Sequence, residues 1–399
     1  MTSKQARSVL MVLPYLETGG TERHVLALAQ GLQGEVALGL LAPPGPLLDE
    51  FLGLGVTYRP FPRLEQGGLQ GIRAFRRGVR ELLRELSPDV IHVHAGAELA
   101  LLVRTVIRSV PVVLTIHAFH GRHADANYRL AARLARLARV DRVIAVAESE
   151  AQRLRQGGLR EPTLKIVYNG VPDRWATLDG TQVDAYGPAG DDLEHPEPVN
   201  ALAIDWQREL GWPERAPVVG AVGRLEAPKG FDLLIEAFAR LDPADYPSPP
   251  RLVVVGDGSE REALQRQARE LGLGDRVYFA GFRGDSWRAF AGFDVTVIPS
   301  RQDGLPLVCL EAMAAGCPVI ASDAGGLPEM VADGVTGLVF RAEDVGALTS
   351  ALARLLKDPA LARRMGQAGR ARFLEEFQLG RMVDRTRAVY AEAIAARLG

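Results

Sequence analysis

The sequence is poor in cysteine, with only Cys309 and Cys317 among its 399 residues. Two thiols cannot form a disulfide framework, so a reducing compartment is expected. Neither thiol has a histidine close to it in the sequence, which makes the pair a poor metal site. No metal ligands are therefore predicted.

Long hydrophobic runs are also missing. The first apolar run, Val9 to Leu13, is too short for the core of a signal peptide and is followed at once by Pro14. No run reaches the ~18 to 20 apolar residues that a membrane-spanning helix needs. We expect a cytoplasmic protein, either soluble or peripheral at the inner face of the membrane.

Aromatic residues make up 6% of the chain and do not alternate with basic ones, so no nucleic-acid partner is predicted. The net charge is −2, but it is unevenly spread. Residues 1–175 hold 23 Lys+Arg against 16 Asp+Glu, whereas the rest of the chain holds 24 against 33. The first half is therefore expected to meet an anionic partner.

Short apolar runs of β-forming residues alternate with segments of helical period along the whole chain. Several runs are apolar nearly throughout, as strands covered on both faces are. This alternation predicts two doubly wound α/β domains. The expected strands are 8–13, 35–41, 56–61, 90–93, 112–116, 142–146 and 164–167, then 218–222, 251–256, 276–280, 294–299 and 318–322. The expected divisions are a first domain at 1–175, an irregular linker at 176–216, a second domain at 217–380 and a last helix at 381–399 that crosses back to the first domain.

Two basic residues occupy the turn after the first strand of the second domain. Arg224 and Lys229 lie in the segment Gly223 to Gly230, which leads into a helix. Two cations beside a helix N-terminus can hold one anion and stabilise a departing diphosphate without a metal. The alternative is a solvated turn with incidental basic residues.

Two acids follow a later strand. Asp303 lies in the loop after that strand, and Glu311 lies about one turn into the next helix. Ionised carboxylates accept hydrogen bonds from sugar and ribose hydroxyls. Two acids at such positions are more often a loop acid and a helix-surface acid without a ligand. The pair alone therefore does not establish a binding site.

Glycine-rich loops follow several strands. Gly19 and Gly20 open a helix and could present amides to phosphate, or form a tight turn capped by Thr21. Gly256 belongs to a Gly-Asp-Gly turn that lacks the third glycine of a dinucleotide fingerprint. His117 ends a strand, where its side chain would face a ligand rather than a core. His92 is interpreted as structural, and His94 is left open.

Together these motifs resemble the retaining glycosyltransferases of family 4, over nearly the whole chain outside the linker. That family has the GT-B architecture, two Rossmann-like domains facing across a cleft. The most specific element is the Glu-x7-Glu signature, here Asp303 to Glu311. The other matching motifs occur in the expected order: Gly19-Gly20, Thr115-x-His117, Tyr168-Asn169-Gly170-Val171, Gly223-Arg224-Leu225 with Lys229-Gly230, Val255-Gly256-Asp257-Gly258 and Gly325-Gly326-x-Pro328-Glu329.

The resemblance implies a nucleotide-diphosphate sugar as substrate, no cofactor and no metal. Arg224 and Lys229 would clamp the diphosphate, with help from the backbone of Gly20, and Glu311 would hold the ribose. Asp303 would meet the transferred sugar, with His117 beside it. The remaining expected contacts of the substrate are Gly19, Asn169, Gly256, Gly304, Leu305 and Leu307.

The chain departs from the family pattern at Asp303, where glutamate is usual, and this puts the donor sugar in question. Pro306 lacks an amide to offer the substrate. No Asp-x-Asp occurs in the sequence, which agrees with a cationic clamp in place of a metal. The alternatives are a nucleotide-sugar epimerase, a phosphorylase on the same fold, or a sugar-nucleotide-binding protein without catalysis.

The acceptor is expected to be a hydroxyl compound bound by the first domain. Arg129, Arg133 and Arg136 repeat at helical spacing beside Leu130, Leu134 and Leu137. Such a helix could rest on an anionic membrane that carries a lipid-linked acceptor. We favour the other interpretation, in which the leucines pack on the sheet and the arginines face water.

Overall fold

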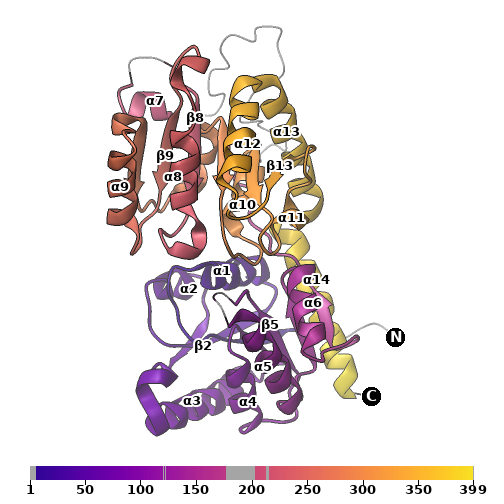
Figure 1. Ribbon diagram of the computed structural model, residues 1–399. Helices are drawn as coiled ribbons and strands as arrows, with labels where there is room; N and C mark the ends of the chain where they lie inside the picture. Colours follow the sequence, from indigo (N-terminus) through magenta and orange to yellow (C-terminus); the bar gives the residue numbers. More distant parts are fainter. Residues whose placement is uncertain (1–5, 120, 122, 177–202, 213–214, 399) are drawn as a thin grey trace. The chain divides into compact units, whose positions relative to one another are not determined.

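The computed structural model describes residues 6–119, 121, 123–176, 203–212 and 215–398 (Figure 1). The chain divides into two compact units. The first unit contains Met1–Pro172 and Gln378–Gly399, and the second contains Asp173–Phe377. Each unit is built on one parallel sheet, which confirms the predicted pair of doubly wound α/β folds.

The first unit has a seven-stranded sheet in the order β3-β2-β1-β4-β5-β6-β7. Its central strands are buried throughout, and successive residues of β1 face opposite sides. Leu10 and Val12 enter one hydrophobic core, whereas Val9 and Met11 enter the other. The strands are β1 (Ser8–Val12), β2 (Ala37–Ala42), β3 (Thr57–Pro60), β4 (Val90–His94), β5 (Val112–Ile116), β6 (Arg142–Ala145) and β7 (Leu164–Ile166).

Helices cover both faces of this sheet. One face carries α3 (Leu64–Leu86), α4 (Ala97–Arg104), α5 (Ala124–Leu137) and α6 (Glu148–Gln156). The other carries α1 (Gly20–Leu32), α2 (Leu48–Leu52) and the last helix, α14 (Leu379–Leu398). Tyr390 of α14 hydrogen-bonds His92 of β4 at 2.7 Å, so the end of the chain is part of the first unit's core.

The second unit has a six-stranded sheet in the order β10-β9-β8-β11-β12-β13. The strands are β8 (Val218–Val222), β9 (Arg251–Val255), β10 (Val277–Gly281), β11 (Val295–Ile298), β12 (Val319–Ser322) and β13 (Gly337–Phe340). The last of these is absent from the strands expected from the sequence. In both units the strand order reverses beside the first strand, between β1 and β4 and between β8 and β11. Ligands of open α/β sheets bind outside the carboxyl ends of the strands at such a point.

Helices connect the strands of the second unit and continue to its end. They are α7 (Trp206–Glu209), α8 (Phe231–Ala239), α9 (Arg261–Glu270), α10 (Leu307–Ala314), α11 (Leu327–Met330), α12 (Val345–Lys357) and α13 (Pro359–Arg372). A π-helical turn, Phe373–Phe377, follows α13 and leads to α14.

Part of the expected linker is packed into the second unit. Trp206 of α7 is 1% exposed and stacks on Phe293, with ring centroids 5.6 Å apart. Residues 177–202 and 213–214 of that segment lie outside the described residues. The chain returns to the first unit at Gln378, whereas the sequence placed this return after residue 380.

The buried face of α5 is not the one expected from the sequence. Tyr128, Ala131, Ala132 and Ala135 form that face, at a spacing of three and four residues. Leu130 and Leu137 are 53% and 61% exposed, so the preferred interpretation was wrong for these two leucines. Leu134 packs against the core and the three arginines of the helix face water, as expected. The small alanines let the helix approach its neighbours closely, and this leaves Leu130 and Leu137 on the outside. None of the helices in the described parts of the chain is long and apolar enough to cross a bilayer.

Candidate functional site

In the second unit, a lysine and an aspartate from two different loops form an ion pair. Lys229 ends the short helical turn after β8, and Asp303 lies in the loop between β11 and α10. Lys229 Nζ donates to Asp303 Oδ2 at 2.6 Å, and the two side chains are 22% and 9% exposed. The pair stands at the point where the strand order reverses. The structure thus brings together two residues that the sequence singled out separately.

Further hydrogen bonds fix the carboxylate of Asp303. Ser300 Oγ donates to Oδ2 at 3.0 Å, and the Gly304 amide donates to Oδ1 at 3.2 Å. A carboxylate oxygen offers about two acceptor positions, so Oδ1 keeps one beyond the Gly304 amide. The aspartate is therefore oriented by its own loop and can still accept a hydrogen bond from a ligand.

Arg224 lies in the same β8 loop as Lys229 but makes a different ion pair. Its Nη1 atom donates to Glu226 Oε1 at 2.9 Å, and its side chain is 57% exposed. An exposed ion pair contributes little to stability, so the guanidinium can exchange Glu226 for another anion at low cost. The convergence of Arg224 and Lys229 on one anion remains a prediction.

Glycines allow the loops after four strands to touch one another. A Cβ atom on Gly256 would lie 1.8 Å from the carbonyl oxygen of Gly223, and one on Gly325 would lie 1.6 Å from that of Asp303. Both glycines have positive φ, 140° and 55°. The Gly326 amide donates to the carbonyl of Gly304 at 2.7 Å. The loops after β8 and β9 thus meet through their backbones, and so do the loops after β11 and β12.

The other predicted residues of this unit lie on or next to α10. Leu305 is buried, Leu307 is the first residue of the helix and Glu311 is a half-buried residue one turn later. The first amides of a helix have no partner within it and can meet a ligand. Pro306 is the N-cap and provides no amide. The thiol of Cys309 faces inward, and burial together with the charge of Asp303 raises its pKa well above the usual range.

In the first unit, a loop and a helix terminus stand at the corresponding point. Gly19 is the N-cap of α1 and Gly20 is its first residue. A Cβ atom on Gly20 would meet nothing within 4 Å, so the backbone is open there. Glu22, which is 2% exposed, accepts a hydrogen bond from the Glu17 amide at 3.2 Å and closes the loop. The geometry provides free space beside a helix N-terminus.

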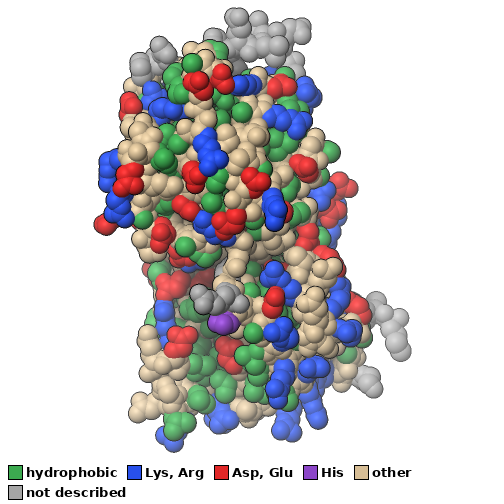
Figure 2. All heavy atoms as spheres, in the orientation of Figure 1, with side chains coloured by type: hydrophobic (Ala, Val, Ile, Leu, Met, Phe, Trp, Pro, Cys, Tyr) green, Lys and Arg blue, Asp and Glu red, His purple; other side chains and the backbone are tan. Residues whose placement is uncertain are grey.

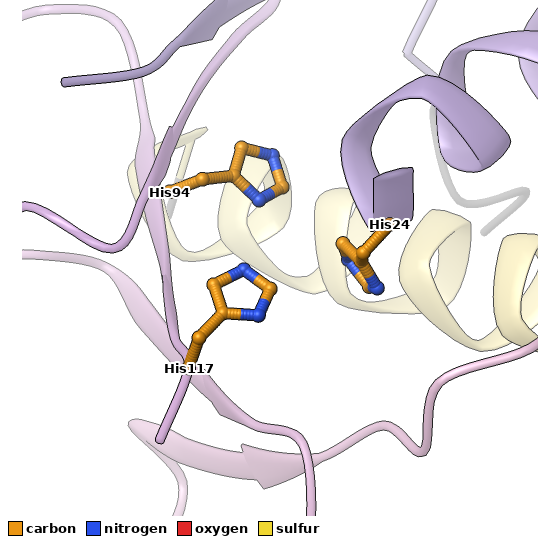
Figure 3. A group of neighbouring side chains, drawn as sticks. All are labelled: His24, His94 and His117. Atoms are coloured by element: carbon orange, nitrogen blue, oxygen red, sulfur yellow. The ribbon is translucent and has the colours of Figure 1, made fainter. Parts of the chain in front are cut away.

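Three histidines gather at this end of the sheet (Figure 3). His24 comes from α1, His94 ends β4 and His117 follows β5. The ring centroid of His117 lies 4.9 Å from that of His24 and 5.9 Å from that of His94. Within the described residues, no hydrogen-bond partner reaches His24 Nδ1, His117 Nε2 or either ring nitrogen of His94. These nitrogens remain available to a polar ligand.

Burial keeps the imidazoles neutral. It lowers the pKa of His24 to about 4, against a smaller opposing effect of the hydrogen bond with Asn169. It also lowers the pKa of His92, His94 and His117 well below the usual range, and the neighbouring imidazoles add to this effect. A neutral imidazole carries one donor and one acceptor, which suits a hydroxyl group.

Neutral imidazole is also the form that binds metals. The ring nitrogens of His24, His94 and His117 lie within 4.8 Å of one another, close enough to hold an ion. The sequence analysis predicted no metal ligands, so this group is new in the structure. Hydrogen bonding to a ligand and metal binding are both compatible with these three rings.

The remaining histidine and Asn169 support the cluster. Both ring nitrogens of His92 are hydrogen-bonded, Nδ1 to Tyr390 Oη at 2.7 Å and Nε2 to Thr115 Oγ1 at 2.7 Å, which agrees with a structural role. Asn169 is 6% exposed and hydrogen-bonds His24. The next residue, Gly170, lies so close to Gln378 that a Cβ atom would come within 2.7 Å of its carbonyl oxygen.

His24 is the residue of the cluster that the sequence analysis missed. Its position one turn after Gly20, on the same side of the helix as the buried leucines, was a usable signal. Thr21, considered as an N-cap, lies inside α1, and the N-cap itself is Gly19.

Comparisons with known proteins agree on one kind of relative. The model of "Glycosyltransferase Family 4" matches residues 18–175, and that of "Glycosyl transferases group 1" matches residues 203–372. The chain is 31% identical over 396 residues to the 2-deoxystreptamine N-acetyl-D-glucosaminyltransferase of Streptomyces fradiae, covering 90% of this chain and 91% of that one. It is 33% identical over 376 residues to the D-inositol 3-phosphate glycosyltransferase of Stackebrandtia nassauensis, covering 88% of this chain and 80% of that one.

Among solved structures, the chain is similar to HepE of Anabaena in complex with UDP. The TM-score is 0.78 at 23% identity, with 96% of this chain and 99% of that chain covered. The same protein in complex with UDP-glucose gives a TM-score of 0.76. At this level of identity the likeness shows the fold.

Proposed function

This chain belongs to the family-4 glycosyltransferases with the GT-B fold, and from that premise we propose that it moves a sugar from a nucleotide-diphosphate donor to a hydroxyl acceptor with retention of configuration. The observation that carries the proposal is the Lys229–Asp303 pair at 2.6 Å, at the carboxyl ends of β8 and β11. It combines a cation suited to phosphate with an acid suited to sugar hydroxyls.

The donor is proposed to replace the contacts that Lys229 and Arg224 now make with acids. Lys229 would turn from Asp303 to the diphosphate, and Arg224 would leave the exposed Glu226. Both cations would then face the negative charge that grows as the bond between sugar and phosphate breaks, which is where electrostatic stabilisation lowers the barrier most. That HepE was crystallised with UDP and with UDP-glucose supports this class of donor.

Asp303 would then hold the transferred sugar. With Lys229 drawn to phosphate, Oδ2 gains an acceptor position while Ser300 and Gly304 still orient the carboxylate. Glu311 would bind the ribose, and the amides near Gly304, Leu305 and Leu307 would line the phosphate and sugar. The close backbone approaches at Gly256 and Gly325 hold the loops that carry these groups together.

On the first unit, we propose that His117 hydrogen-bonds a hydroxyl of the donor sugar or of the acceptor. Its ring is neutral, and its Nε2 atom has no partner within the described residues. His24 and His94 would complete this polar wall, Asn169 would hold His24 in place, and the open backbone at Gly20, next to Gly19, would reach phosphate.

Transfer is proposed to proceed on one face of the sugar. The bond from the anomeric carbon to the diphosphate oxygen breaks, and the acceptor oxygen forms its bond to the same carbon from the same side. The acceptor proton passes to the leaving phosphate oxygen, so no enzymic nucleophile is needed. Two protein cations do the work of a metal ion, and we propose that neither metal nor cofactor takes part.

The acceptor is proposed to belong to polysaccharide, glycolipid or other glycoconjugate synthesis in the cytoplasm. A lipid-linked acceptor would bring the first unit to the inner face of the membrane. An epimerase would convert the donor alone, and a phosphorylase would need inorganic phosphate. The named relatives are transferases, and the cations and acids expected of an active enzyme are present.

A panel of nucleotide-diphosphate sugars tests the donor assignment. A ligand that binds the folded state raises its unfolding temperature, so one or a few members of the panel should do so. The nucleoside diphosphate of the same base should give part of the shift. If no member of the panel shifts the transition, the donor class is refuted.

A further inference from the structure

The exposed face of α5 carries leucines and arginines together. Leu130 and Leu137 are seven residues apart, which places them two turns apart on one side of the helix, and they are 53% and 61% exposed. Arg133 lies beside them on the same face, and Arg129 and Arg136 follow along one flank. All three arginines are exposed. The helix spans 14 residues, or about 21 Å.

This basic face carries more positive than negative charge. Ion pairs to Arg129, Arg133 and Arg136 are absent from the described residues. The one acid of the helix, Asp125, is 3.9 Å from Arg153 of α6, which offsets it. Arg136 extends over Gly158 at the end of α6, so the arginine flank continues toward that helix. Figure 2 shows Lys and Arg side chains gathered over the part of the first unit labelled α5 and α6 in Figure 1.

The chemistry of this face selects its partner. Exposed leucines in line with arginines are typical of a helix that lies in the plane of a membrane interface, with the leucines among the acyl chains and the arginines at anionic headgroups. A nucleic acid would leave the leucines in water, and a purely charged partner would not use them. The face is not needed for packing, because Tyr128 and three alanines already bury the opposite side.

We infer that the α5 face made of Arg129, Leu130, Arg133, Arg136 and Leu137 docks the first unit on an anionic lipid bilayer. This inference extends the proposed function, because it says where a lipid-linked acceptor would be met. It gives a role to three of the basic residues in the positively charged first half of the chain. Docking depends on burial of the leucines among the acyl chains and on attraction of the arginines to anionic headgroups. Substituting the leucines or the arginines removes each contribution separately.

Vesicle flotation tests the inference. The full chain should float at low salt with vesicles of equal parts phosphatidylcholine and phosphatidylglycerol, and stay behind with phosphatidylcholine alone. Changing Arg129, Arg133 and Arg136 together to Gln should weaken partitioning about a hundredfold, since each arginine near an anionic surface is worth about fivefold. The Leu130→Gln/Leu137→Gln variant should weaken it by at least about tenfold.

Matched control variants carry the same changes elsewhere. Arg266, Arg354 and Arg364 of the second unit are exposed arginines, and Leu52 and Leu271 are 45% and 43% exposed. Changing either set to Gln should leave flotation unaltered. Wild-type protein that does not float with anionic vesicles, or α5 variants that float as well as the controls, would overturn the inference.

A second measurement separates this inference from the proposed function. Donor binding, followed by the shift in unfolding temperature with a nucleotide sugar, should be equal in the wild type and in both α5 variants. If the α5 variants no longer float but still bind the donor, the docking face is supported. If the wild-type protein does not float but binds the donor, the docking face is refuted and the transferase proposal stands.

Discussion

Mild acid should weaken the first unit through its buried histidines. Burial lowers the pKa of His24 from its usual 6.5 to about 4. An unfolded chain binds a proton at this residue below pH 6.5, whereas the folded chain does not until about pH 4. The contribution of His24 to the free energy of unfolding is therefore fully present above pH 6.5 and is lost as the pH falls toward 4.

The size of this effect follows from the two pKa values. At pH 5, His24 alone should reduce the free energy of unfolding by about 2 kcal/mol relative to pH 8. For a unit of this size, that corresponds to roughly 4 to 8 °C in the unfolding temperature. His92, His94 and His117 shift in the same direction and add to the loss.

Circular dichroism melts at pH 8 and pH 5 would measure the effect. The wild type should lose more of its unfolding temperature between these two pH values than the His24→Asn variant does, by roughly 4 to 8 °C. The exposed His123 provides the control, and His123→Asn should behave as the wild type. If the His24 variant shows the same acid dependence as the wild type, the burial argument is refuted.

Three further predictions concern the second unit and metal use. Asp303→Glu should shift the preference among donor sugars, because the carboxylate moves by one methylene from its place 2.6 Å from Lys229 Nζ; an unchanged donor profile in a sugar panel would count against the contact. Gly325→Ala should destabilise the protein by more than about 1 kcal/mol, because φ at this position is 55° and the new Cβ atom would lie 1.6 Å from the carbonyl oxygen of Asp303. A urea titration that gives the variant the same free energy of unfolding as the wild type would disprove the close approach. Transfer should survive EDTA, and activity that returns only with added metal would show that an ion, held for example by His24, His94 and His117, takes part.

Much of the fold could be predicted because buried parallel strands have a simple pattern. The run Val218–Val222 and the run Val112–Ile116 are continuous apolar segments, and both are strands with the expected bounds. β13 was missed because Gly337–Phe340 begins with glycine, which is depleted in strands, and this leaves only three apolar residues to carry the signal. The other edge strands, β3, β7 and β10, carry enough apolar and β-branched residues to be predicted.

Helix faces were harder to predict, because hydrophobicity does not say which side of a helix is covered. In α5, leucines and alanines compete for the inside, and the sequence favoured the leucines. The structure buries Ala131, Ala132 and Ala135, since small side chains fit a close approach to α4 and α6. Hydrophobic strength and available space are separate quantities, and only the second depends on neighbours distant in the sequence.

In the candidate site too, the sequence indicates the local elements but not the contacts between residues that are distant in the chain. The loops that bear Lys229 and Asp303 could be found from the sequence because each follows a strand of a parallel sheet. Their ion pair could not, because it depends on the Cβ-free approach at Gly230, which lies against Pro299, and at Gly325. The position of His24 one turn after Gly20 was a signal, but a single histidine on a buried helix face also resembles a core residue until His94 and His117 are placed beside it.

The most direct test of the account is the turnover of the Lys229→Ala variant, measured in EDTA with the donor found in the sugar panel. The control is Lys357→Ala, which removes another lysine of the second unit. Lys357 Nζ lies 2.7 Å from Asp245 Oδ2 and belongs to none of the loops of the candidate site. Since Lys229 is assigned to charge that develops only in the transition state, its loss should lower kcat by about two to three orders of magnitude, while the control keeps the wild-type rate. Equal rates for Lys229→Ala and Lys357→Ala would contradict the proposal that this lysine stabilises the departing diphosphate.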